Sequence, residues 1–336
     1  MKKLVFIFFS LIFYTNNAVS AESAVILMYH RFGEDGFKST NIRLEQLEAH
    51  IKELRTGAYT VLPVTKIMSQ IKNGIPIPDR TVGITIDDGF KSIYRNAWPR
   101  FKRAKLPFTV FISTDPIDKK RPKYLTWGQV REMHAAGVDF GAHTASHLHM
   151  PATSPERIKA EIIKSNNRIT SQLGKAPTLF AYPFGEAGND VIEATRIGKY
   201  SFSFGQHSGV IHQNSNFNYL PRFAINEKFG GLDRFKLILN TLPFPVTDFT
   251  PRDSKIVGIN PPNVGFTVTP SFKNLRRITC FVSGEGRVPI TILGTDRIEI
   301  RPSKPFARGR TRLNCTLPGV GGRWHWLGTL FVRPII

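Results

Sequence analysis

The spacing of apolar residues follows one pattern along most of the chain and a different pattern after residue 243. Between residues 24 and 242, short apolar runs of strand length alternate with segments whose apolar residues recur every three or four positions. Leu47, Ile51 and Leu54 form one such series, and Gly57 ends the helix that it predicts. Repeated strand–helix units predict an α/β fold with a parallel sheet, either a barrel or a doubly wound sheet.

Several boundaries in this region have specific signals. Thr126 and Gln129 form a capping-box pattern, which predicts a helix that ends near Gly137. Ser154 followed by Pro155 predicts the start of a long helix that runs to about residue 173. We expect the strands at residues 24–29, 59–64, 81–86, 108–112, 138–142, 178–182, 200–204 and 219–224.

After Pro243-Phe244-Pro245 the helical rhythm is absent. Short β-like runs separated by Gly and Pro, the first at residues 255–259, predict a small all-β sandwich-like domain. We therefore place an α/β domain at residues 22–245 and a β domain at residues 246–336. The chain has two cysteines, Cys280 and Cys315, both in the second region. In an oxidising compartment we expect them to pair, and the alternative is two buried free thiols.

Two tryptophans near the C-terminus, Trp324 and Trp326, alternate along one predicted strand. Exposed tryptophans stack on sugar rings, so a carbohydrate contact is one interpretation. Packing in the domain core is the more usual use of such a pair.

The first 21 residues have the pattern of a secretory signal peptide. Lys2 and Lys3 precede an apolar run at residues 4–14, and the small residues 18–21 follow it. The alternative is a membrane anchor, but the run is shorter than the ~20 residues that span a bilayer. We expect cleavage near Ala21, a periplasmic or extracellular protein, and no transmembrane segment after cleavage.

The chain is strongly basic. Its formal net charge is +21, and the loss of Lys2 and Lys3 lowers this to +19. Such a charge favours anionic partners. For an exported protein we expect a cell-wall polymer, an acidic polysaccharide or an anionic membrane surface, and no nucleic acid. The alternative is that the charge serves solubility alone.

Candidate chemistry gathers at the ends of predicted strands, where α/β folds place their active sites. Asp87 and Asp88 close one apolar strand, and His143 and His147 follow another. Consecutive side chains at a strand end point in different directions, so one carboxylate can bind a metal while its neighbour faces the reacting group. The alternative for the acidic pair is an ordinary turn or helix start, and for the histidines a structural role.

A carboxylate and two neutral imidazoles suit zinc or another divalent ion, with coordination positions left for water and substrate. Such an ion lowers the pKa of its bound water and polarises a carbonyl under attack. The pattern therefore favours one divalent cation, with zinc as the expected metal, and a hydrolytic reaction.

Together these motifs resemble the NodB-homology polysaccharide deacetylases, which are carbohydrate esterase family four. Thr85-Ile86-Asp87-Asp88-Gly89 and His143-Thr144-Ala145-Ser146-His147 resemble the first two family motifs. The segment 25–30 resembles the first strand of the family. Tyr182-Pro183-Phe184-Gly185 resembles the third motif of exported poly-N-acetylglucosamine deacetylases. The resemblance covers residues 24–242 and implies a distorted (β/α) barrel of about seven strands.

The resemblance also implies the roles of individual residues. Asp88, His143 and His147 would bind the metal, and Asp87 would be the catalytic base. The amide N–H of Phe184, with Tyr182 beside it, would lie at the tetrahedral oxyanion. The substrate would be an N-acetylated glycan, with peptidoglycan or poly-N-acetylglucosamine ahead of chitin oligomers. The products would be acetate and a free amine.

Two departures from the family pattern stand out. Ala181 occupies the position where many members have an arginine that orients the base. Arg222 is our candidate replacement, and an ordinary surface arginine is the alternative. The late histidine motif that supplies the general acid has no clear copy. We predict His207 for that role, with His212 as the second candidate. His30 either lines the site or has a structural role.

Two other functions compete with the deacetylase. The first is a non-catalytic glycan-binding protein that retains the fold, which the loss of arginine at Ala181 favours. The intact Asp87 and metal-ligand motifs oppose it, because a binding protein has no use for a base beside a metal. The second is metal-dependent hydrolysis of an amide bond in a small molecule.

Overall fold

A computed structural model describes residues 20–269, 272 and 274–334 of the protein. The predicted signal peptide lies outside the described residues except for its last two positions. These form β1 (Ser20–Ala21), which pairs with β6 (Ile77–Pro78). Within the described ranges, no helix combines the length and the apolar character that a membrane span requires.

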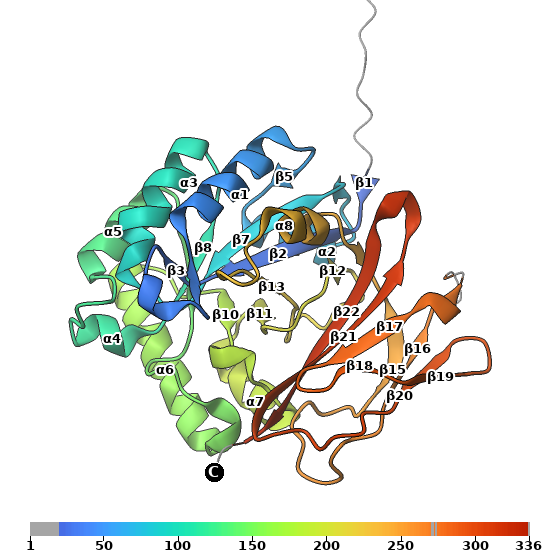
Figure 1. Ribbon diagram of the computed structural model, residues 1–336. Helices are drawn as coiled ribbons and strands as arrows, with labels where there is room; N and C mark the ends of the chain where they lie inside the picture. The colour runs from blue at the N-terminus through green and yellow to red at the C-terminus, as the bar shows by residue number, and fades with distance from the viewer. Residues whose placement is uncertain (1–19, 270–271, 273, 335–336) are drawn as a thin grey trace, which may run out of the picture.

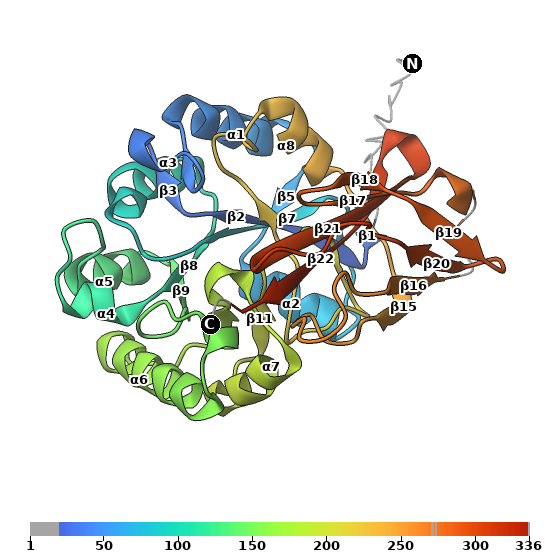
Figure 2. The ribbon, with the colours of Figure 1, turned by 60° about the horizontal axis from the view of Figure 1, so that its bottom comes forward.

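A nine-stranded sheet forms the centre of the first part of the chain (Figures 1 and 2). Its main path runs in the order β11-β10-β9-β8-β7-β2-β12, and β5 and β13 pair with β7 and β2. Every pair is parallel except β12 with β2. The sheet curls into a half-barrel, and the predicted α/β class is confirmed. The strands are β2 (Ser23–Tyr29), β5 (Thr60–Val61), β7 (Thr81–Ile86), β8 (Thr109–Ile112), β9 (Asp139–Ala142), β10 (Leu179–Ala181), β11 (Phe202–Phe204), β12 (Ile211–His212) and β13 (Phe223–Ala224).

Helices connect and cover these strands. They are α1 (Leu44–Thr56), α2 (Val64–Lys72), α3 (Trp98–Ala104), α4 (Thr114–Asp118), α5 (Trp127–Ala135), α6 (Pro155–Leu173), α7 (Asn189–Thr195) and α8 (Leu232–Leu239). The predicted caps are confirmed, since Thr126 and Ser154 accept from the third backbone N–H of α5 and α6. The strand predicted at 59–64 is wrong beyond Val61. The chain turns at Pro63 into α2, whose apolar face is buried.

The C-terminal part contains two sheets, whose strand pairs are antiparallel except for the parallel pair of β14 with β22. One has the order β14-β22-β21-β17-β18 and the other β15-β16-β20-β19. The strands are β14 (Leu242–Pro243), β15 (Val246–Thr250), β16 (Val264–Val268), β17 (Thr279–Val282), β18 (Gly286–Val288), β19 (Ile290–Leu293), β20 (Arg297–Ile300), β21 (Gly309–Pro318) and β22 (Trp324–Arg333). The predicted run at 255–259 is wrong, since only Lys255 makes a bridge, to Val332.

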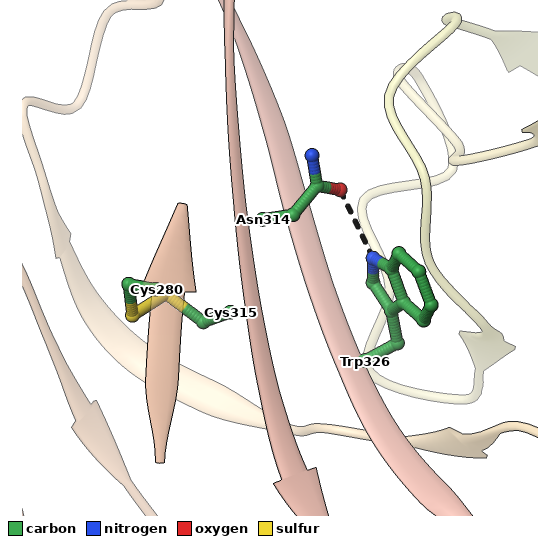
Figure 3. Close-up of a disulfide and its surroundings, with 4 residues drawn as sticks. All are labelled: Cys280, Asn314, Cys315 and Trp326. Atoms are coloured by element: carbon green, nitrogen blue, oxygen red, sulfur yellow. Dashed lines mark hydrogen bonds between the residues drawn. A yellow bond between two sulfur atoms is a disulfide. The ribbon is translucent and has the colours of Figure 1, made fainter. Parts of the chain in front are cut away.

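A disulfide joins two neighbouring strands of the C-terminal part. Cys280 of β17 lies opposite Cys315 of β21 and is bonded to it, which confirms the predicted pairing (Figure 3). The two cysteines belong to a buried apolar cluster that is separate from the clusters around the nine-stranded sheet. The boundary that we predict at residue 245 falls between β14 and β15, although β14 already pairs with β22.

The C-terminal strands pack directly against the first part. Arg323 forms an ion pair with Asp79 at 3.1 Å. The ring of Trp326 lies edge-on to buried Phe223, and its indole N–H donates to Asn314 at 3.0 Å (Figure 3). Trp326 is therefore occupied by packing, whereas Trp324 remains exposed.

Candidate active site

Three side chains that follow two strands of the sheet, β7 and β9, on either side of β8, converge on one point. Asp88 follows β7, and His143 follows β9 with His147 four residues later. Asp88 Oδ1 lies 3.3 Å from His143 Nε2 and 3.1 Å from His147 Nε2. The three potential ligand atoms all lie within 4.8 Å of one another. The structure thus brings together the three residues that we predict as metal ligands.

The surroundings of these atoms fit a cation. His143 Nδ1 lies 2.6 Å from the carbonyl oxygen of Ala181, so Nδ1 carries the proton and Nε2 keeps a free lone pair. Asp88 Oδ1 and His143 Nε2 are buried, and neither has a hydrogen-bond partner among the described residues. Buried polar atoms are normally paired. A divalent ion bound between them satisfies both atoms with ligand types that it favours.

The backbone around the site adopts a conformation that non-glycine residues rarely use. Asp88, Thr144, His147 and Phe184 have positive φ values of 75°, 57°, 62° and 59°. Such residues cost about 1–3 kcal/mol each and persist where surrounding structure imposes them. These left-handed residues change the direction of the chain after β7, β9 and β10. They lie at or next to the residues that we predict as metal ligands.

Asp87 does not join the three ligands but pairs with Arg222. Two guanidinium nitrogens of Arg222 donate to the two carboxylate oxygens at 2.7 and 2.8 Å. Arg222 also donates to Thr85 Oγ1 at 3.0 Å and to the carbonyl of Gly205 at 2.9 Å. Both side chains of the pair are fully buried. Burial alone raises the pKa of Asp87, but Arg222 and the nearby histidines bring it below its ordinary value.

Arg222 reaches Asp87, the predicted base, from a different strand than the family pattern suggests. It directly precedes β13, which pairs with β2, whereas Ala181 ends β10 several strands away. The surface-arginine alternative is wrong, because the side chain of Arg222 is completely buried. Ala181 instead supplies the carbonyl that fixes His143.

The histidines considered as the acid lie in different surroundings. His30 follows β2, and its Nε2 lies 4.0 Å from Asp87 Oδ2. His207 is buried against the ring of Tyr219 at 4.5 Å. Burial and then Arg222 lower the pKa of His207 to about 3. His212 pairs with Ser23 at the opposite end of β2, roughly 20 Å of strand from the site.

The turn after β10 brings Phe184 to the ligands. The Phe184 ring lies edge-on to His147 with centroids 4.4 Å apart. Tyr182 is fully buried, its N–H donates to the carbonyl of Phe204, and its hydroxyl donates to Asn218 O at 2.9 Å. Both donors of Tyr182 are thus used inside the fold. The N–H groups of Gly185 and Glu186 close the turn itself, so Phe184 is the residue of this turn that suits an oxyanion contact.

A cavity of about 240 Å³ opens beside the ligands. Its lining combines His147 with cationic, acidic and aromatic side chains, namely Asp115, Pro116, Lys119, Arg121, Tyr124 and Ser146. Lys164 forms an ion pair with Asp115 at 2.7 Å. Lys119 also forms an ion pair with Asp115, at 3.8 Å. Because Lys119, Lys164 and Arg121 outnumber this one carboxylate, the opening beside the imidazole of His147 has a positive balance.

Comparison with known families identifies this region. Residues 74–202 match the family model described as polysaccharide deacetylase. The chain contains a polysaccharide deacetylase domain. The matched span includes Asp87, the three potential ligands and Phe184, but neither His30 nor Arg222. The resemblance that the motifs indicate is therefore confirmed.

The relatives of this deacetylase domain are consistent with one another. The poly-beta-1,6-N-acetyl-D-glucosamine N-deacetylase of Staphylococcus aureus is 26% identical over 231 residues, covering 61% of this chain and 79% of that protein. The Streptococcus pyogenes deacetylase PplD, solved with acetate, has a TM-score of 0.60 at 20% identity over 65% of this chain and 98% of its own. IcaB from Ammonifex degensii has a TM-score of 0.58 at 21% identity, covering 65% and 97%. These two structures establish the fold.

Proposed function

We propose that this protein removes N-acetyl groups from a polysaccharide containing N-acetylglucosamine, using one divalent cation, most simply zinc. The observation that carries the proposal is the buried Asp87–Arg222 pair beside the ligand set of Asp88, His143 and His147. A protein that only binds a glycan has no need for a second, fully buried carboxylate oriented by a bidentate arginine. Because Arg222 does this, alanine at position 181 no longer argues for an inactive fold.

The reaction follows from the positions of these groups. A cation bound by Asp88, His143 and His147 supplies Lewis-acid activation of water and of the acetyl carbonyl. Asp87 accepts a proton from the attacking water while Arg222 holds the carboxylate in place. The water oxygen bonds to the acetyl carbon, and the N–H of Phe184 donates to the oxyanion that develops. The C–N bond then breaks, the sugar nitrogen takes up a proton, and acetate and a free amine leave.

We assign the proton donor to His30, with the predicted His207 as the competing candidate. His30 lies beside Asp87 at the carboxyl end of β2, and its side chain is 12% exposed. A general acid must carry a proton at the working pH and reach the leaving group. Burial lowers the pKa of both histidines, but the carboxylates of Asp88 and Asp87 oppose this lowering at His30. At His207, Arg222 adds to the effect of burial, and the pKa falls to about 3.

The relatives and the charge suggest the polymer. The Staphylococcus aureus relative is named for poly-beta-1,6-N-acetyl-D-glucosamine, so we propose a β-1,6-linked N-acetylglucosamine polymer first and peptidoglycan second. The net charge, which is +21 for the whole chain and +19 without Lys2 and Lys3, and the positive opening beside His147 favour anionic material around the substrate. We further propose that residues 1–21 direct export to the periplasm or the exterior, and that residues 246–336 form a separate β domain.

Acetate release from N-acetylglucosamine polymers tests the function. Zinc-loaded wild type should release acetate, and a chelator or D87N should abolish most of the release. D233N, which changes an exposed aspartate of α8, should retain full activity. Wild type that releases no acetate from any glycan at full metal loading contradicts the proposal, and full activity in D87N contradicts the assignment of the base.

The acid is tested in the same assay. H30A should lower kcat at neutral pH far more than H207A does, and a leaving group that needs no protonation should restore H30A. If H207A shows the larger loss and the same rescue, the donor is His207.

A further inference from the structure

Residues of the C-terminal sheets reach the turn that carries Phe184. Arg310, near the start of β21, donates from Nη1 to the carbonyl oxygen of Phe184 at 3.0 Å. Its Nε lies 3.8 Å from Glu186 Oε1, and its guanidinium carbon lies 5.7 Å from the centre of the Phe184 ring. One arginine from a strand 126 residues later thus contacts both the middle residue of this short turn, Phe184, and the residue that follows it, Glu186.

The other side of the turn belongs to the deacetylase part. His149 stacks on the Phe184 ring with centroids 3.7 Å apart and planes 7° apart. His149 Nδ1 lies 2.9 Å from Glu186 Oε2. Glu186 is almost completely buried, so its carboxylate links His149 on one side to Arg310 on the other. Phe184 is held at its ring by His149 and at its carbonyl by Arg310.

This support matters because Phe184 has a left-handed backbone, with φ at 59°. A residue in that conformation stays there only when its surroundings fix it. Fixing the Phe184 carbonyl limits rotation about the same residue, and hence limits the direction of its N–H. An oxyanion donor is effective only when it is already oriented.

We infer that Arg310 is a positioning residue for the oxyanion donor, which makes the C-terminal β-sheet a working part of the active site. The inference rests on the proposed function. It gives the C-terminal part a role in turnover that is separate from glycan binding through an exposed tryptophan.

Arg310 is not needed to attach the C-terminal part. Arg323, on the far side of the interface, forms an ion pair with Asp79 and donates to the carbonyl of Asn240 at 2.8 Å. The hydroxyl of Ser254 donates to Ala187 O, and β14 pairs with β22. A change at Arg310 can therefore be separated from undocking, and Arg323 provides a matched arginine that crosses the same interface.

The experiment compares R310A, R310K and R323A in the full-length, zinc-loaded protein. Substrates are a short acetylated substrate and a long N-acetylglucosamine oligomer. R310A should lower kcat ~10- to 100-fold on both, with KM within about twofold of wild type, because a displaced donor costs transition-state stabilisation. R310K should recover a large part of kcat, since an ammonium can still donate to the Phe184 carbonyl. R323A should lower the melting temperature while kcat stays within about twofold.

Three results overturn the inference. They are a wild-type kcat in R310A, an equal loss of kcat in R323A, and a loss confined to the KM of the long oligomer. The last would make Arg310 a contact for the polymer. Where R310A fails to fold, a kcat of R310K at or below ~1% of wild type likewise rejects positioning through the carbonyl. Absence of acetate release by wild type is a different outcome, which rejects the proposed function itself.

Discussion

Replacing Arg222 by methionine leaves Asp87 as a fully buried carboxylate without its bidentate partner. The substitution removes contacts of 2.7 and 2.8 Å to the carboxylate, and further donors to Thr85 and Gly205. Removing one member of a buried ion pair costs about 3–5 kcal/mol. The protein can limit this cost, because Asp87 can take up a proton.

How far protonation of Asp87 reduces the destabilisation depends on pH. Protonating a carboxyl with an ordinary pKa of 3.8 costs about 1.36 kcal/mol per pH unit, which is about 4 kcal/mol at pH 7 and about 2 kcal/mol at pH 5. In wild type the folded pKa of Asp87 lies below the unfolded value, so its contribution is present at neutral pH and lost as the pH falls through the folded pKa. In R222M the folded pKa lies above the unfolded value. The destabilisation should therefore be largest at neutral pH and shrink towards pH 4.

Urea unfolding of wild type, R222M, D87N and the double variant at pH 5, 6 and 7 measures this coupling. At each pH the double-mutant cycle separates the coupling between Arg222 and Asp87 from the effect that each substitution has on its own. R222M should also shift the acid limb of kcat/KM to higher pH. A destabilisation below 1 kcal/mol, or one of 3–5 kcal/mol that does not change between pH 5 and 7, would refute the reasoning.

Three further predictions concern the rest of the molecule. The change C280S/C315S should lower the free energy of unfolding by about 4 kcal/mol, because the disulfide closes a loop with a sequence separation of 35; denaturation that is insensitive to reductant and to the substitution contradicts this. G328A should lower the free energy of unfolding by about 1–3 kcal/mol, because a Cβ at this position would lie 2.1 Å from the carbonyl oxygen of Ser208. The control G258A, which has open space around it among the described residues, should change the free energy of unfolding by no more than about 0.5 kcal/mol, and thermal unfolding of both variants measures the difference. Zinc at 100 times its Kd should stabilise wild type and D233N by about 2.7 kcal/mol, and D88N and H147A should lose most of this shift; an equal shift in D88N would place the cation elsewhere.

The ligand set could be predicted because its residues lie in short motifs at strand ends. The apolar run before Asp87 and the strand before His143 place these side chains at the carboxyl ends of parallel strands. The structure has these strand ends on the same side of the sheet, with the three potential ligand atoms close together. The α/β class and the caps of α5 and α6 follow from equally local signals, and the structure has them. Features of the fold that depend on neighbouring residues in the sequence can therefore be predicted from the sequence.

Contacts between distant segments could not be predicted in the same way. The sequence places Arg222 near a strand, but only the pairing of β13 with β2 shows that it meets Asp87, 135 residues away. Nothing in the sequence around Arg310 or Glu186 indicates that they meet, because the partner strand belongs to a different sheet. The error at α2 has a local cause: Pro63 ends the strand early, and Val64, which we predict as the last residue of the strand, is the first residue of the helix.

Counting acetate and free amino groups in one reaction tests the central claim most directly. A β-1,6-linked N-acetylglucosamine oligomer is incubated with zinc-loaded wild type, and D87N serves as the control. The account predicts that both products appear in equal amounts, that a chelator stops both, and that D87N forms neither at a comparable rate. Oligomer that binds to the metal-loaded protein yet yields neither acetate nor amine would contradict it and would identify a glycan-binding protein with a deacetylase fold.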